Sequence, residues 1–112
     1  SWIGMACDSA NNVYAIANPG GLYKQTGGVG SFVNVGSVIN RDYYWMCFLN
    51  NNLYVAVRDS GIFVQRNLIG DFVPISPQVS PTNEWIAIGS TYNGALYAAR
   101  YQSNISKSLS LN

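Results

Sequence analysis

One stretch of this sequence occurs twice, and it constrains the fold more than any other feature. Residues 21–36 are GLYKQTGGVGSFVNVG, and residues 61–76, forty positions later, are GIFVQRNLIGDFVPIS. Five positions are identical without a gap: Gly21/Gly61, Gln25/Gln65, Gly30/Gly70, Phe32/Phe72 and Val33/Val73. A 112-residue chain that repeats such a segment is expected to fold as an array of similar units.

Two further anchors extend the repeat to a third copy. An aromatic residue opens WIGMACD, YYWMCFL and WIAIGST, at spacings of 41 and 42 residues: Trp2, Tyr43 and Trp85. A tyrosine recurs within VYAIA, LYVAV and LYAAR: Tyr14, Tyr54 and Tyr97. We therefore interpret 1–112 as a single module of three repeats, 1–42, 43–84 and 85–112, of which the last is truncated.

Each anchor lies on a short run that is rich in Val, Ile, Tyr, Trp and Phe, which indicates strands rather than helices. Asn- and Gly-containing stretches between these runs are typical of tight turns. Four short strands in about 42 residues match one blade of a β-propeller. The sequence thus predicts an all-β fold of propeller blades, each with four antiparallel strands and about three blades per chain.

Three blades are too few to close a ring, because propellers have about four to eight. An open array would expose two large apolar blade faces, and the chain is 48% hydrophobic and only 10% charged. We therefore expect a homo-oligomer, with a six-bladed dimer favoured. Closing strands are expected from the tail SKSLSLN, in which Leu109 and Leu111 alternate with polar residues. The alternative is that the chain, which begins at Ser1, is a piece of a longer propeller.

Composition also limits the partners. The formal net charge is +1 with no run of either sign, so nucleic acid is not an expected partner. No apolar run is long enough to predict a membrane span. The chain has no histidine, and Cys7 and Cys47 lie in apolar surroundings without metal-ligand spacing. We expect no metal or other cofactor and two buried free thiols, with a disulfide as the alternative.

The string WIGMA, then NNVYA, then GGLYKQTGGVGSFV resembles the repeat of propeller proteins from tailed bacteriophages and their metagenomic relatives, commonly proteins of the virion or tail. The resemblance covers nearly all of residues 2–36 and becomes weaker in the second and third copies. It implies a propeller, a virion-associated or extracellular location, and recognition of a surface or host cell. It transfers no catalytic residue.

An enzymatic function is not the expectation, because histidine is the commonest general base and is absent. A carboxylate pair for glycoside hydrolysis is the remaining possibility. Asp42 and Glu84 each precede the opening aromatic of a copy, which would place them on one rim of adjacent blades. The alternative is that both are solvated loop acids.

Aromatic side chains suggest a binding function, since a sugar can lie against an exposed ring while amides and hydroxyls orient it. The predicted ligand-binding residues lie where one copy ends and the next begins: Arg41, Tyr43, Tyr44, Trp45, Asn83 and Trp85, with Asn40 nearby. The alternative for each ring is packing between blades, and we expect Trp2 and Trp85 in the core. Tyr44 and Trp45 are the better candidates for exposure, because consecutive strand residues point to opposite faces.

These observations predict a non-enzymatic propeller module that recognises a surface glycan or host cell. A purely structural virion or scaffold element that binds copies of itself is the alternative from another class.

Overall fold

The computed structural model describes residues 2–17, 21–36, 42–76, 78, 85–100 and 105–108, with residues 36 and 105–108 described by their backbone alone. The first sheet contains β1 (Trp2–Cys7), β2 (Val13–Ala17), β3 (Leu22–Gln25) and β4 (Val33–Gly36). The second sheet contains β5 (Tyr43–Leu49), β6 (Asn52–Val57), β7 (Gly61–Gln65) and β8 (Val73–Pro74). The third sheet contains β9 (Trp85–Ser90), β10 (Leu96–Arg100) and β11 (Ile105–Ser108).

Every strand pairs in antiparallel fashion with its neighbour along the chain. Two one-turn 3-10 segments, η1 (Thr26–Gly28) and η2 (Arg66–Leu68), follow β3 and β7 at equivalent places. No helix in the part of the chain that the structure describes has the length and apolarity needed to cross a membrane. The prediction of an all-β fold with antiparallel sheets is confirmed.

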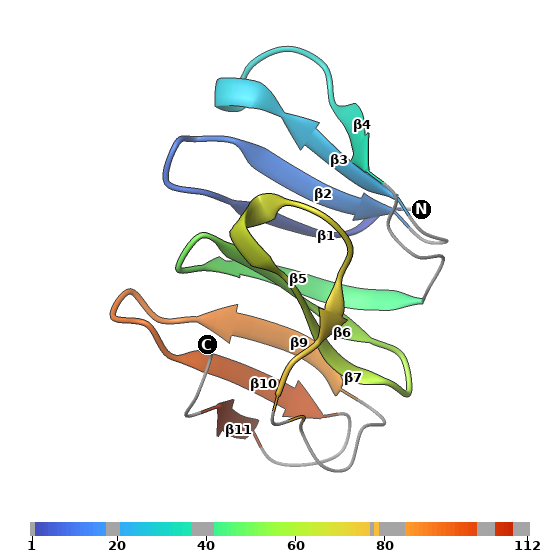
Figure 1. The fold of residues 1–112 in the computed structure, drawn as a ribbon, viewed down its shortest axis with the longest axis vertical. Helices are drawn as coiled ribbons and strands as arrows, with labels where there is room; N and C mark the ends of the chain where they lie inside the picture. The colour runs from blue at the N-terminus through green and yellow to red at the C-terminus, as the bar shows by residue number, and fades with distance from the viewer. Residues whose placement is uncertain are drawn as a thin grey trace.

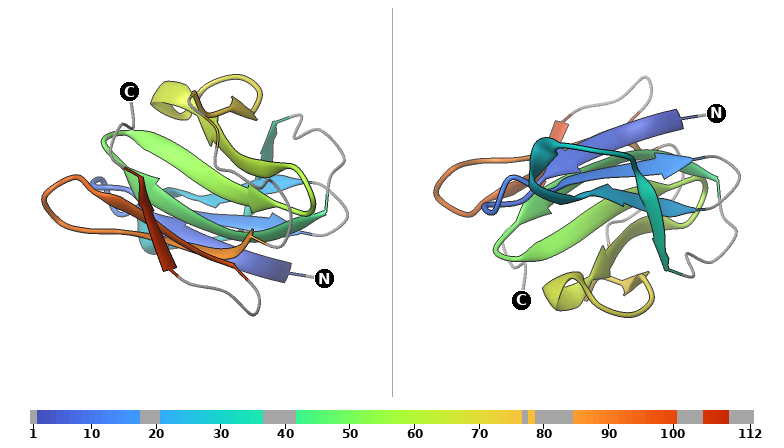
Figure 2. Two further views of the ribbon diagram at one scale, coloured as in Figure 1. Left: turned by 90° about the horizontal axis from the view of Figure 1, so that it is seen from below. Right: turned by 90° about the horizontal axis from the view of Figure 1, so that it is seen from above.

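The three sheets lie one after another, with the second between the other two (Figure 1). Their first strands are neighbours, because β5 contacts both β1 and β9. The turns that join the first and second strands of all three sheets lie on one side of the molecule, at the left of Figure 1. Figure 2 shows the same order from both ends of the stack.

Two hydrophobic clusters hold the stack together, and the second sheet contributes one face to each. The cluster between the first and second sheets contains Tyr14, Ile16, Leu22, Tyr43, Met46, Leu53, Val55, Val57, Phe63 and Phe72. The cluster between the second and third sheets contains Cys47, Leu49, Tyr54, Ala56, Ile62, Val64, Ile75, Trp85, Ile88, Leu96 and Ala98. Alternate residues of β6 and β7 enter different clusters, as the two-residue period of a strand requires.

This alternation gives each sheet two distinct faces. We call the face toward the next sheet along the chain the leading face, and the opposite face the trailing face. Tyr14 and Tyr54 lie on leading faces, and Tyr43 and Trp85 lie on trailing faces. The leading face of the first sheet therefore packs on the trailing face of the second, and the second packs on the third in the same way.

Turn chemistry fixes the hairpins that carry these faces. Asn50 and Asn51 have φ angles of 50° and 63°, which asparagine tolerates in a two-residue hairpin turn. The wider turn after β1 is held by the Asp8 carboxylate, which accepts hydrogen bonds from the backbone N–H groups of Ala10 and Asn12 at 2.9 and 3.0 Å. These contacts set the register of the paired strands, and with it the side chains on each face.

The structure corrects one of the two cysteine expectations, and it does not describe the leucines of the C-terminal tail. Both cysteines are free and Cys47 is buried as expected, but Cys7 is exposed because no described sheet covers its side of β1. The final strand ends at Ser108 and pairs with β10 of its own sheet. Leu109 and Leu111 lie outside the described residues.

Candidate functional site

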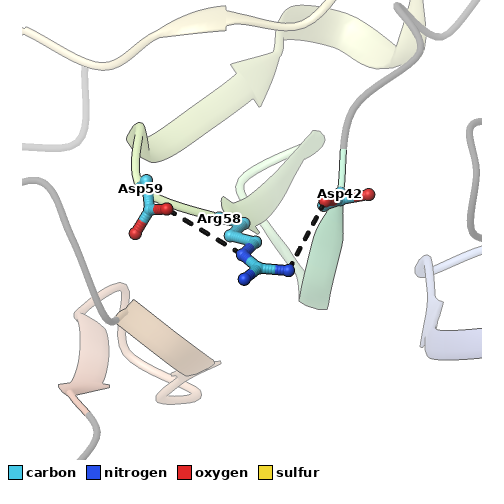
Figure 3. A network of polar contacts seen from close by, with 3 residues as sticks. All are labelled: Asp42, Arg58 and Asp59. Atoms are coloured by element: carbon cyan, nitrogen blue, oxygen red, sulfur yellow. Dashed lines mark ion pairs between the residues drawn. The ribbon is translucent and has the colours of Figure 1, made fainter.

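The predicted carboxylate rim contains an ion-pair network at the start of β5 (Figure 3). The Arg58 guanidinium lies between two carboxylates, 3.8 Å from an Asp42 oxygen and 3.8 Å from an Asp59 oxygen. The Arg58 backbone N–H also donates to the Asp42 carbonyl at 2.8 Å, which ties the start of β5 to the turn after β6. All three side chains are more than half exposed, so these ion pairs contribute little to stability.

This network bears on the carboxylate hypothesis. A shallow cleft of about 460 Å³ beside it is lined by Asp42, Val57, Arg58, Asp59 and Ser60. Asp42 therefore faces an arginine, and its described carboxylate neighbour is Asp59 on the other side of that arginine. Glu84, the predicted partner of Asp42, lies outside the described residues, as do Asn40, Arg41 and Asn83.

The predicted aromatic site divides into buried and accessible rings. Tyr43 and Trp85 are only 1% and 2% exposed, because each lies on a trailing face that the preceding sheet covers. A ligand would not reach these two rings in the folded chain. Tyr44 is partly buried against the second cluster, and Trp45 is 45% exposed. The pairing of β5 with β6 shifts between Tyr43 and Trp45, which explains why the aromatic run departs from simple alternation.

Trp2 differs from the expectation that it belongs to the core, since it is 59% exposed. Its ring contacts Tyr23 with centroids 5.0 Å apart and Phe32 with centroids 6.4 Å apart. Met5 is 55% exposed and pairs with Ala15, which in turn pairs with Tyr23 on the same face. Together these side chains form an apolar trailing face of the first sheet that no described element covers.

The leading face of the third sheet is another apolar surface that none of the described elements covers. Leu96, Ala98 and Ile88 pack on the second sheet, so the residues that alternate with them point outward. Tyr97 pairs with Gly89, and Ala99 pairs with Ala87, which places these four on one face. Tyr97 is 36% exposed, and a shallow hollow of about 170 Å³ extends along this face. The face combines one tyrosine with small residues.

These two outer faces repeat the residues that are buried inside the molecule. On trailing faces Met5, 55% exposed, corresponds to Met46, which is 1% exposed, and Phe32, 36% exposed, corresponds to Phe72, which is 2% exposed. On leading faces Tyr97, 36% exposed, corresponds to Tyr14 and Tyr54, which are 3% and 1% exposed. The trailing face of the first sheet thus resembles the covered trailing face of the second, and the leading face of the third sheet carries the same tyrosine as the covered leading faces of the two earlier sheets.

The sequence contained a signal for these surfaces that the residue-by-residue prediction missed. Among the described residues, no sheet covers the trailing face of the first sheet or the leading face of the third. The strand period of two, applied to the repeat, assigns Met5 to the first of these faces and Ala87 and Tyr97 to the second.

A cleft with both polar and apolar side chains lies at the turn side of the stack. It has a volume of about 560 Å³ and is lined by residues of all three sheets: Cys7, Asp8, Ser9, Phe48, Leu49, Asn50, Ser90, Thr91 and Tyr92. Two of its hydroxyl groups are hydrogen-bonded to neighbouring residues. The Ser90 hydroxyl donates to the Phe48 carbonyl at 2.9 Å, and Thr91 bonds to Asn93 at 2.7 Å.

Asp8 is the most constrained ionisable group near this cleft. Partial burial acts to raise the pKa of Asp8, but hydrogen bonds from Asn12, Ala10 and Tyr14 outweigh it and hold the pKa below its usual value. The Tyr14 hydroxyl donates to Asp8 at 3.1 Å, and burial together with this bond raises the pKa of Tyr14 to about 12. Burial also raises the pKa of the Cys47 thiol to about 12, so that thiol is unreactive near neutral pH.

Among the described residues, no three His, Cys, Asp or Glu side chains gather where they could hold a metal ion. No family model and no curated protein matches this sequence.

Proposed function

We propose that the chain is a non-enzymatic β-propeller module whose function is to bind copies of itself and close into a ring. The single observation that carries this proposal is the composition of the two outer faces. They repeat the residues of faces that are buried between neighbouring sheets of the same chain.

Burial of the exposed apolar side chains would favour self-association. Trp2, Met5 and Phe32 lie together on one outer face, and burying a large apolar side chain fully is worth about 1.5 to 3 kcal/mol. Clustered apolar patches of this kind mark protein interaction surfaces. A second copy is the partner of matching shape, since this sequence already builds the complementary face. The ring of two chains would contain six sheets, of which the two third sheets have three described strands each.

Self-association is tested by measuring the solution mass by light scattering. We expect twice the 12.2 kDa mass of the chain for a two-chain ring, or a higher multiple for a larger one. Trp2→Glu places a charge on the trailing face of the first sheet and should shift the mass to that of a single chain. Ile69→Glu is the matched control, because Ile69 is 76% exposed on a loop and its change should leave the mass unaltered.

Circular dichroism would show that both variants keep their strands. A wild-type protein that stays folded as a single chain at high concentration would contradict the proposal.

A second candidate function is recognition of a surface glycan. It is favoured by the exposure of the Trp45 ring on β5, the first strand of the second sheet. An array of immobilised oligosaccharides tests it, with Trp45→Ala examined against any glycan that binds. The virion-associated or extracellular location stays a prediction from the repeat.

A further inference from the structure

We infer that the joint between copies is head to tail, with Ala87 on the leading face of one copy packed against Met5 on the trailing face of the next. This inference rests on the proposed self-association and specifies its orientation and register.

The register of the contact between two copies is inferred from the contact between the first and second sheets within one chain. Gly4, on the leading face of the first sheet, lies so close to the second sheet that an added Cβ would be 3.2 Å from the Met46 backbone nitrogen and 3.5 Å from the Met46 Cγ. The spacing of 41 residues makes Met5 the counterpart of Met46, and the spacings of 41 and 42 make Ala87 the counterpart of Gly4. The equivalent contact in the next joint is therefore Ala87 against Met5 of a second copy, with the two sheets slightly further apart because Ala87 carries the Cβ that Gly4 lacks.

The orientation comes from side-chain size. The leading face of the third sheet combines small residues with one tyrosine: Ala87, Gly89 and Tyr97. Trailing faces carry large side chains, as Trp2 and Met5 do in the first sheet. Large side chains pack well against small ones, whereas two trailing faces would oppose bulky residues and two leading faces would leave voids.

A head-to-tail joint is heterologous, so it either closes a ring or continues as an open filament. Each copy has one free face of each kind, which means that a ring of two chains contains two identical joints. The covalent products of a cross-linking experiment can distinguish the two assemblies.

Cysteine cross-linking tests the register directly. The Met5→Cys/Ala87→Cys variant, made with Cys7→Ser, is oxidised at neutral pH and run without reductant. The two new cysteines lie on opposite outer faces of one chain, so a disulfide between them must join two chains. We expect the band to shift from 12.2 kDa to twice that mass for a two-chain ring, and to a ladder for an open filament, both reversed by reductant.

The two single-cysteine variants in the Cys7→Ser background are the matched controls. Each alone should stay at single-chain mass, while a mixture of the two should form the cross-linked pair. The mixture also serves if the double variant fails to fold. Cross-linking of Met5→Cys with itself would overturn the head-to-tail orientation. Absence of any cross-link in protein that light scattering shows to be associated would overturn the register, while self-association itself would stand.

Discussion

The two copies of the repeated segment, 21–36 and 61–76, have nearly the same local structure and very different surroundings. In both, a strand is followed by a 3-10 turn, and a glutamine side chain closes the loop on a glycine carbonyl: Gln25 on Gly30 at 2.7 Å and Gln65 on Gly70 at 2.8 Å. Yet every residue of β7 is buried, whereas only Leu22 is buried in β3. The local sequence thus specifies the hairpin, and the number of neighbouring sheets specifies the burial.

The different surroundings of the first and second sheets support the proposed self-association. The second sheet has a neighbour on each face, and its copy of the segment is part of two hydrophobic clusters. Within the described part of the chain, the first sheet has a neighbour on one face alone, and Tyr23 and Phe32 on the other face stay partly accessible. A second copy of the chain would give the first sheet the environment that the second sheet already has.

The largest expected effect separates the two phenylalanines of the segment. Phe72→Ala should lower the free energy of unfolding by about 3 to 5 kcal/mol, because it removes a fully buried ring and leaves a cavity. Phe32→Ala should cost the single chain about 1 to 2 kcal/mol, since that ring is already 36% exposed. Urea unfolding at low protein concentration measures both. Equal losses would show that the first sheet is covered in the single chain.

A smaller effect is expected at the glutamines. Gln65→Ala should cost about 1 kcal/mol, because the change removes the hydrogen bond to Gly70 and buried packing. The cost stays moderate because the buried Oε1 of Gln65 has no hydrogen-bond partner among the described residues. Gln25→Ala should change stability by less than about 0.5 kcal/mol, as expected for a more exposed site. Thermal unfolding of the two variants gives the difference, and a larger loss at Gln25 would contradict this account.

The smallest expected difference concerns the 3-10 turns. Gly27 and Gly28 have φ angles of 66° and 75°, and Asn67 and Leu68 adopt the same left-handed region at 56° and 61°. Leu68 packs against the cluster between the first and second sheets, which offsets its backbone strain. Gly28→Leu should therefore destabilise the chain by about 1 kcal/mol, because the new side chain meets no such neighbour.

Leu68→Gly should change stability less, since relief of backbone strain opposes lost packing. Urea titrations of both variants measure the contrast. An increase in stability for Gly28→Leu would show that a partner already covers the first turn.

Particular residues show how far the sequence prediction reached. The strand runs at VYAIA, LYVAV and LYAAR were predictable because β-branched and aromatic residues between Asn and Gly turns strongly favour strands. The burial of Cys47 was also predicted. The exposure of Trp2 and Cys7 was not, because Trp2 was assigned to the core from its place in the repeat and Cys7 from its apolar surroundings.

The exposure of the predicted aromatic site was also only partly predictable from the sequence. Tyr43 and Trp85 have the residue type of sugar-binding platforms, but their trailing faces are covered by the preceding sheet. Trp45 is accessible, as predicted from its place in the aromatic run, but the shift in strand pairing beside it was not predicted.

The amino-acid sequence by itself determined the units: their strand content, their turns, their period and the alternation of faces within each strand. These are local properties, because backbone preferences and turn chemistry act over a few residues. The tertiary structure alone decided which faces are covered, because burial depends on what packs against a sheet and not on the sheet's own residues. The same aromatic is therefore core in the middle of the array and surface at its end.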